Sequence, residues 1–166
     1  FFEPSDVVTD SMFIEVMRKA LRMAARAGVV LAMEIMDTPY MGTITRAMEY
    51  LKKIPSPYFK IYPDIGNLSN FTEDVPGELA LGLGEIVALH VKETKPGVFR
   101  DLEFGEGTVD FAGIFQALHS LGYQGMFLLE MWADNSRSQT VEEAAAHIAK
   151  ARSYVTEKMK QGGMTL

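Results

Sequence analysis

Cysteine is absent from this chain of 166 residues, and only three histidines are present. Without cysteine the chain cannot form a disulfide scaffold or a thiolate metal site, and the redox compartment stays open. Basic residues are also few, with 16 Lys and Arg against 22 Asp and Glu, for a net charge of −6. A nucleic-acid-binding protein needs a basic face, so we expect no nucleic-acid partner.

Long apolar runs are missing as well. No run approaches the roughly 20 residues of a membrane-spanning helix, so we expect no membrane partner. Residues 1–6 lack a basic region followed by an apolar stretch, and we expect no signal peptide. The composition, 48% hydrophobic and 23% charged, is ordinary for a folded chain of this length. We therefore expect residues 1–166 to form a single domain.

Short apolar runs alternate with stretches of helical spacing. The runs over 29–36, 58–63, 86–92 and 126–132 are predicted to be buried parallel strands. Helices are predicted to start at a Thr9 or Asp10 cap, to cover 43–54 and 76–84, to follow Asp110, and to cover 139–160, with a loop over 65–69. This alternation predicts a parallel α/β sheet with right-handed crossovers.

Four strand–helix units preceded by one helix are half of an eight-unit barrel, which takes about 250 residues. We therefore predict α/β architecture, the C-terminal half of a (β/α)8 TIM barrel. An open doubly wound sheet is the rival, but no Gly-x-Gly-x-x-Gly turn follows the first strand. A half barrel would expose strand edges at 29–35 and 126–132 and apolar interior side chains, so we expect two copies to pair into a homo-oligomer.

Each predicted strand ends on a residue that can bind a metal ion: Glu34, Asp64, His90 and Glu130. Strand ends of a parallel barrel face one cavity, so we expect these side chains to converge. Three carboxylates and one imidazole gathered at one point would be unfavourable unless a cation lay among them. The oxygen-rich set suits Mn²⁺, Mg²⁺ or Co²⁺ and tolerates Zn²⁺.

Each of these residues also has a plainer interpretation by itself. Glu34 could end a strand facing solvent, Asp64 could be a turn former, and His90 could be a satisfied core residue. Glu130 lies between apolar residues, where a carboxylate without a partner is costly, so a functional role is favoured for it alone. The joint pattern supports a metal site more strongly than any single residue does.

These residues lie in motifs that resemble the L-ribulose-5-phosphate 3-epimerases, also called L-xylulose-5-phosphate 3-epimerases, which are xylose-isomerase-like TIM barrels. The resemblance covers nearly the whole chain and implies the C-terminal portion of such an enzyme. The matching stretches are Glu-Ile-Met-Asp-Thr at 34–38, Tyr-Pro-Asp-Ile-Gly-Asn-Leu-Ser at 62–69, His-Val-Lys-Glu-Thr-Lys-Pro-Gly at 90–97, Phe-Gly-Glu-Gly at 104–107 and Leu-Glu-Met-Trp at 129–132.

The resemblance implies that Glu34, Asp64, His90 and Glu130 bind a divalent metal, and that Glu34 and Glu130 also transfer protons. It implies a cytoplasmic isomerase of carbohydrate metabolism and L-ascorbate degradation, acting on a phosphorylated ketopentose. Epimerising C3 of a 2-ketose removes a carbon-bound proton next to a carbonyl, and a metal at O2 and O3 would stabilise the enediolate. One carboxylate would take the proton from one face and the other would return it to the opposite face.

The substrate phosphate needs cationic or N–H donors. Lys92 and Lys95 are candidates, and Asn67 could donate to a sugar hydroxyl, although a solvated loop or a turn would explain each equally well. The remaining histidines, His119 and His147, fall within predicted helices and are expected at the surface.

Other functions stay open from the sequence. A sugar isomerase or an epimerase of unphosphorylated ketoses could use the same scaffold. A repair endonuclease of related fold would need more metal-binding histidines and a basic groove, and neither is present. A half barrel that folds, oligomerises and binds metal without catalysis is the non-enzymatic alternative.

Overall fold

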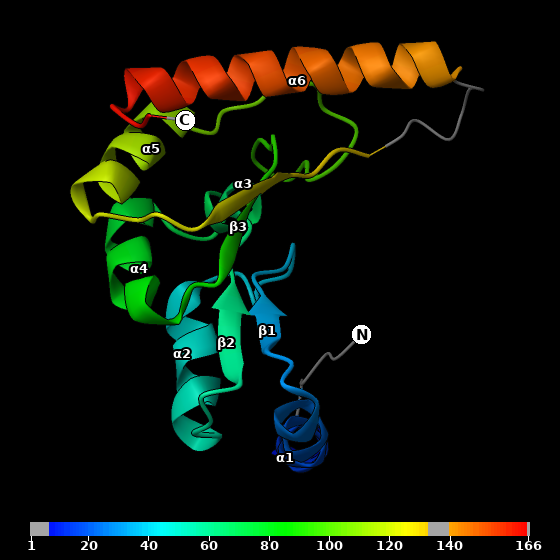
Figure 1. Ribbon diagram of the computed structural model, residues 1–166, viewed down its shortest axis with the longest axis vertical. Helices are drawn as coiled ribbons and strands as arrows, with labels where there is room; N and C mark the ends of the chain where they lie inside the picture. The colour runs from blue at the N-terminus through cyan, green and yellow to red at the C-terminus, as the bar shows by residue number, and fades with distance from the viewer. Residues whose placement is uncertain (1–6, 133–139, 166) are drawn as a thin grey trace.

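The structure is a computed structural model that describes residues 7–132 and 140–165. Its strands alternate with helices as predicted (Figure 1). The elements are α1 (Val7–Ala27), β1 (Leu31–Glu34), α2 (Ile44–Lys53), β2 (Phe59–Tyr62), α3 (Ile65–Leu68), α4 (Val75–Gly82), the 3₁₀ helix η1 (Leu83–Glu85), β3 (Ala88–Val91), α5 (Phe111–Ser120), β4 (Met126–Leu129) and α6 (Val141–Gln161). Within these two ranges, no helix combines the length and the apolar character needed to span a lipid bilayer.

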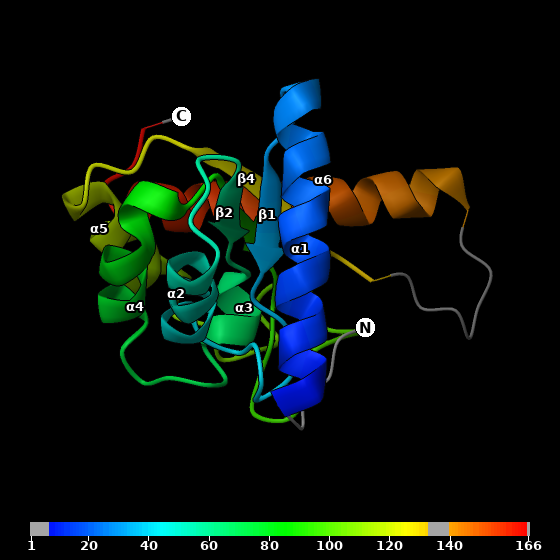
Figure 2. The ribbon, with the colours of Figure 1, turned by 90° about the horizontal axis from the view of Figure 1, so that it is seen from below.

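The four strands form a parallel wall in chain order. β1 pairs with β2, and β3 pairs with β4, both in parallel. Two isolated parallel bridges, Ile61 with Ile86 and Asp64 with His90, join β2 to β3. Figure 1 shows α2, α4 and α5 along the outer side of this arc and α1 below β1, and Figure 2, seen from below, shows α1 along its whole length. The predicted half of a TIM barrel is confirmed.

The hydrophobic core lies between the strands and the outer helices. Alternate strand residues point toward the helices and are almost fully buried, namely Phe59, Ile61, Leu89 and Val91. They pack with buried helix residues, which include Ile44, Ala47 and Tyr50 on α2, Leu79 on α4, and Phe115 and Leu118 on α5. Removing this apolar surface from water is the main stabilising contribution to the fold.

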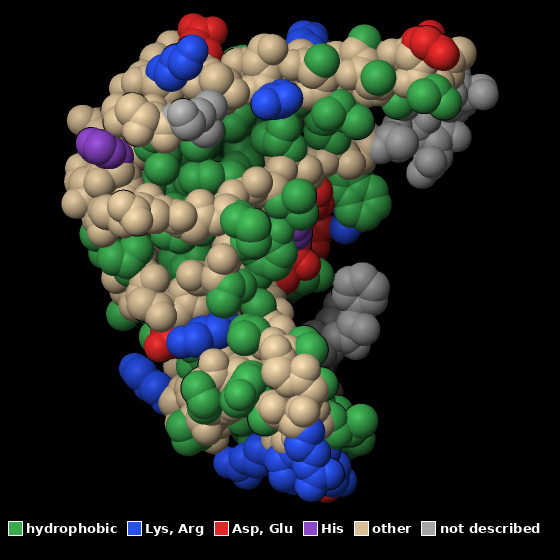
Figure 3. All heavy atoms as spheres, in the orientation of Figure 1, with side chains coloured by type: hydrophobic (Ala, Val, Ile, Leu, Met, Phe, Trp, Pro, Cys, Tyr) green, Lys and Arg blue, Asp and Glu red, His purple; other side chains and the backbone are tan. Residues whose placement is uncertain are grey.

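The opposite face of the sheet is open and partly apolar. Met126 and Leu128, which the strand register places on the same face as His90, are 74% and 54% exposed, and Val30 is 45% exposed. β1 and β4 each pair with one strand among the described residues, so both are sheet edges. Figure 3 shows hydrophobic side chains exposed along the strands. Exposed apolar side chains gathered on one face of a sheet are usually covered in a stable protein.

The strands are shorter than the sequence predicted, and the first helix begins earlier. Each strand has four residues, because the ladder hydrogen bonds stop before the ends of the apolar runs. α1 already begins at Val7, so Thr9 and Asp10 do not cap it. Asp10 lies inside the helix, where its carboxylate accepts from Tyr50 and pairs with Lys53 at 3.2 Å.

The second correction concerns the segments after β2. Residues 65–69 were predicted to be a loop, but they contain α3, one turn of helix. Asp64 caps it, since its Oδ1 accepts from the backbone N–H groups of Gly66 at 2.8 Å and Asn67 at 3.0 Å. The helix predicted over 76–84 is divided into α4 and η1.

The last helices follow the sequence prediction closely. Asp110 caps α5 by accepting from Gly113 N. Thr140 and Glu143 form a capping box at the start of α6; residue 139, which was expected to belong to this helix, lies outside the described residues. His119 on α5 is exposed, and His147 on α6 is partly exposed, as expected.

Candidate metal centre

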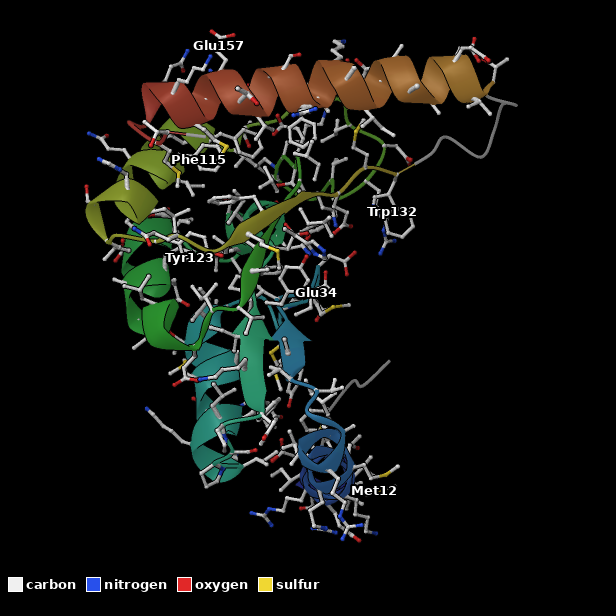
Figure 4. The ribbon with its side chains drawn as sticks, viewed as in Figure 1. Met12, Glu34, Phe115, Tyr123, Trp132 and Glu157 are labelled. Atoms are coloured by element: carbon white, nitrogen blue, oxygen red, sulfur yellow. The ribbon has the colours of Figure 1, made fainter. Side chains whose placement is uncertain are left out.

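The four ligand-type residues come from the ends of four successive strands. Glu34 is the last residue of β1, Asp64 caps α3 just after β2, His90 is the penultimate residue of β3, and Glu130 follows β4. We call these four residues the metal centre. Figure 4 shows Glu34 on the open side of the sheet, and Figure 3 shows acidic and histidine side chains gathered in the recess there.

Backbone hydrogen bonds bring these strand ends to the same level. His90 N donates to the Pro63 carbonyl at 2.8 Å, which places His90 beside Asp64. Glu130 N donates to the Val91 carbonyl at 2.9 Å, which continues the β3–β4 ladder by one residue. The convergence is therefore a property of strand register and not of loop conformation.

One potential ligand atom from each member of the metal centre lies within 4.8 Å of the others. His90 Nδ1 is 2.9 Å from Glu34 Oε1 and 3.2 Å from Glu130 Oε2, so the two glutamates meet at one ring nitrogen. The structure thus brings together the four residues singled out from the sequence. Their role as metal ligands stays a prediction.

Asp64 is the most buried member of the metal centre, with no exposed surface. Its Oδ1 accepts the two N–H groups of α3, but its Oδ2 is buried without a hydrogen-bond donor and lies 3.6 Å from Lys92 Nζ. Burial raises the pKa of the Asp64 carboxyl to about 7, against the lowering effects of the Asn67 N–H and Lys92. A buried oxygen without a donor is unfavourable unless a cation satisfies it.

Glu130 is held at one oxygen and left available at the other. Its Oε1 accepts from Trp132 Nε1 at 2.9 Å and lies 3.1 Å from Lys92 Nζ, whereas its Oε2 faces His90. Burial alone would raise the pKa of the Glu130 carboxyl, but the hydrogen bonds from Trp132 and Lys92 and the charges of Lys92 and His90 lower it below the usual value.

His90 is positioned by its ring as well as by its strand. The hydrogen bond between Nδ1 and Glu34 raises the pKa of the imidazole despite partial burial, and the charges of Glu34, Glu130 and Asp64 add to this. The Tyr62 ring lies against the imidazole, with ring centroids 4.2 Å apart. The imidazole of His90 thus lies between two carboxylates, and a cation bound at this point would compensate the same negative charges.

The donor set fits a divalent cation on two grounds. Three carboxylates and one imidazole are typical ligands of Mg²⁺, Mn²⁺, Co²⁺ and Zn²⁺. The Asp64 Oδ2 atom is orphaned and buried among the other donors, as a metal-ligating oxygen is expected to be. These groups can hold a metal and place two carboxylates around a small ligand.

Of the three residues expected to bind substrate, Asn67 and Lys92 are buried near the metal centre, whereas Lys95 is not in contact with it among the described residues. Asn67 is 3% exposed and bridges two segments, since its Nδ2 donates to the Ile35 carbonyl at 3.0 Å and its Oδ1 accepts from Lys92 at 3.3 Å. Lys92 lies beside the metal centre. For Lys95, whose backbone pairs with Val98, no contact of the side chain with the metal centre is found within 7–132 and 140–165. Their roles toward a substrate stay predictions.

Several residues that shape the site were missed from the sequence. Trp132 and Tyr62 contact Glu130 and His90 directly, and both stand two residues from a ligand-type position, a spacing that could have indicated them. Arg100 stacks on the Trp132 ring at 4.6 Å and pairs with Asp37 at 2.6 Å, which links the loops after β1, β3 and β4.

Buried Glu93 anchors the long loop after β3. Its Oε2 accepts from Gly105 N at 2.8 Å, and its Oε1 accepts from Thr94 N at 3.2 Å. Gly107 lies so close to this carboxylate that a side chain there would collide with it. The Phe-Gly-Glu-Gly motif at 104–107 therefore holds the loop against the end of β3.

Residues 3–151 match the sequence profile of the family described as xylose isomerase-like TIM barrel. L-ribulose-5-phosphate 3-epimerase UlaE of Escherichia coli (strain K12 / DH10B) is 46% identical over 164 residues, which are 99% of this chain and 56% of that protein. The Escherichia fergusonii protein of the same name gives the same values. The chain thus spans about half the length of the curated relatives it matches.

Solved structures show the same fold at lower identity. An L-ribulose 3-epimerase matches with a TM-score of 0.77 and 21% identity, over 96% of this chain and 57% of that one. D-allulose 3-epimerase from Methylomonas sp. matches with a TM-score of 0.75 and 18% identity, over 95% of this chain and 58% of that one. These likenesses support the half-barrel architecture.

Proposed function

We propose a function for this chain from the premise that it belongs to the xylose isomerase-like TIM barrel family. The chain carries the metal centre and the proton-transfer residues of a 3-epimerase. The reaction is the interconversion of L-ribulose 5-phosphate and L-xylulose 5-phosphate. The main support is the convergence of four ligand-type side chains within 4.8 Å. The substrate is inferred from the 46% identity to proteins named L-ribulose-5-phosphate 3-epimerase.

The positions of the two glutamates suit an inversion at carbon. Inverting C3 needs one group that takes a proton from one face and another that delivers a proton to the other face. Glu34 and Glu130 come from the two edges of the sheet, and their carboxylates approach the same point beside His90. We assign proton removal to one of them and proton return to the other, with the roles exchanged in the reverse direction.

The other members of the metal centre orient this pair. Asp64 and His90 would hold the cation together with Glu34 and Glu130. The cation, when bound, supplies positive charge beside the negative charge that develops on the substrate oxygens. Lys92, Lys95 and Asn67 remain the proposed contacts for the phosphate and hydroxyl groups.

The test replaces the corresponding portion of the full-length E. coli relative with this chain, because the chain spans about half of that protein. In this chimera, Glu34→Gln and Glu130→Gln are each expected to slow epimerisation by about 100-fold or more, since each removes a proton-transfer group. Exchange of the C3 hydrogen with deuterated solvent follows each half-reaction separately. Glu157→Gln is the matched control, because Glu157 lies on the outer side of α6 (Figure 4). Full epimerisation by both site variants would refute the two-glutamate mechanism.

A second candidate is a half barrel that binds metal without turnover when alone. The exposed interior residues and the two sheet edges favour it, because the isolated chain has part of its barrel wall uncovered. Assaying the chain beside the chimera separates the two, and light scattering of the chain shows whether copies pair into the proposed homo-oligomer. Turnover of L-ribulose compared with L-ribulose 5-phosphate distinguishes an epimerase of free ketoses.

A further inference from the structure

Lys92 is a buried cation next to the metal centre. It follows β3 directly and is 4% exposed. Its Nζ lies 3.1 Å from Glu130 Oε1 and 3.6 Å from Asp64 Oδ2, and it donates to Asn67 Oδ1 at 3.3 Å. Burying an ammonium is costly, and it is tolerated where charged partners compensate. Here the partners are two of the residues expected to bind the metal.

The ammonium changes the charge that a bound ion meets. The three carboxylates of the metal centre carry three negative charges when ionised, and the positive charge of Lys92 reduces this negative charge to −2 when His90 is neutral. This value matches a divalent cation. Without Lys92 the same groups would carry −3, which favours an ion of higher charge.

Lys92 also engages one oxygen of Glu130 and leaves the other available, whereas at Asp64 the backbone has this role. At Glu130, Lys92 and Trp132 both approach Oε1, and Oε2 is left facing His90 Nδ1 at 3.2 Å. At Asp64, backbone N–H groups hold Oδ1, and Oδ2 is left without a hydrogen-bond donor. Each of these two carboxylates is therefore anchored at one oxygen and presents one oxygen to the centre.

We propose that Lys92 is a positioning residue that matches the metal centre to a divalent cation and keeps Glu130 Oε1 turned away from it. The inference rests on the metal-dependent function proposed above. It assigns to Lys92 a role in choosing the ion, distinct from binding the substrate phosphate. It predicts that loss of the positive charge changes the preference between trivalent and divalent ions.

The experiment measures Tb³⁺ and Mn²⁺ binding to the chain without any sugar. Trp132 is the chain's only tryptophan and contacts Glu130, so it can sensitise Tb³⁺ luminescence at the site, and Mn²⁺ displaces Tb³⁺ in competition. Lys92→Gln and Lys92→Met are expected to raise the Tb³⁺/Mn²⁺ affinity ratio by about tenfold or more. The reason is that the positive charge of Lys92 repels a trivalent ion half again as strongly as a divalent ion, so its removal favours Tb³⁺ more than Mn²⁺. Lys92→Arg keeps the charge and is expected to keep the ratio near that of the unchanged chain.

Lys60→Met is the matched control, because it removes the same charge from a lysine that pairs with Glu85 at 2.6 Å, away from the metal centre. An unchanged ratio in Lys92→Gln, or an equal rise in Lys60→Met, would overturn the inference while leaving the epimerase proposal intact. If Lys92→Met does not fold, the Gln and Arg variants carry the comparison. If the unchanged chain binds neither ion, the metal centre itself is wrong, and both proposals fall together.

Discussion

The metal centre contains two unlike pairs of residues. Asp64 and His90, the central pair, come from the middle strands and are held by an N-cap, a parallel bridge and an aromatic ring. Glu34 and Glu130, the edge pair, come from the two edge strands, with side chains 38% and 21% exposed against 0% and 15% for the central pair. The central pair is therefore fixed by this chain's own fold, whereas the surroundings of the edge pair depend on what covers the sheet edges.

The largest difference between the pairs should appear when one carboxylate is neutralised in each. Asp64→Asn is expected to weaken Mn²⁺ binding by about 100-fold, because a buried charge acts in a low dielectric, and Glu34→Gln by only about tenfold. Asp64→Asn should also stabilise the metal-free chain at pH 8 by roughly 1–3 kcal/mol, since the ionised, buried carboxylate is unfavourable. Titration calorimetry and denaturant unfolding measure the two effects, and equal losses of affinity would remove the distinction between the pairs.

A second effect should appear on changing the pH, and it reports on the central pair. Metal binding requires unprotonated Asp64 and His90, whose pKa values are both raised, that of Asp64 to about 7. Because each of the two groups must lose its proton, affinity for Mn²⁺ should rise by up to about 100-fold per pH unit from about pH 5 toward 6 and level off once both groups are unprotonated. Proton release measured in two buffers of different ionisation enthalpy checks this, and pH-independent binding would contradict it.

The stability of the metal-free chain should change in the opposite direction. Between the ordinary Asp pKa and about 7, the folded state keeps a proton on Asp64 that the unfolded state has lost, so stability falls as the pH rises through this window. His90 acts in the same direction, since the stability from its raised pKa is present at low pH and lost as the pH rises. The lowered pKa of Glu130 acts only below about pH 4.5, where its contribution is lost as the pH falls.

The smallest expected effect concerns the support of the edge pair. Trp132→Phe removes the N–H that donates to Glu130 Oε1 but keeps an aromatic ring for Arg100. Because Trp132 is half exposed, water can replace the donor, and Mn²⁺ affinity should fall by only about threefold. In the chimera, the rate of C3 hydrogen exchange should fall more than the affinity does. A larger loss than in Glu34→Gln would show that Glu130 depends on this neighbour more than on the sheet.

The strand–helix order and the convergence of the four ligand-type residues could be predicted, because both follow from a local pattern in the sequence. Apolar runs ending on Glu34, Asp64, His90 and Glu130 are a local pattern, and parallel pairing of strands converts that pattern into proximity. The helical turn of α3 was missed, because it depends on Asp64 accepting two N–H groups over a segment with Gly and Asn.

The burial of Lys92 and the start of α1 could not be read from local pattern. Lys92 looks like an ordinary loop lysine until Glu130, 38 positions later, is placed beside it. The N-cap expected of Asp10 was wrong because Tyr50 and Lys53, on another helix, engage its carboxylate. Contacts between segments distant along the chain decide these features, and a single sequence does not record them.

The tight approach of α3 to β3 restricts how this protein can vary over evolutionary time. A side chain at Gly66 would strike the Lys92 carbonyl oxygen, whereas at Gly84 nothing lies within 4 Å of an added Cβ. Related sequences can therefore carry other residues at position 84. At position 66 we expect glycine alone, unless β3 shifts to make room for a side chain. Drift in the two glycines should be unequal for this steric reason, independent of any catalytic selection.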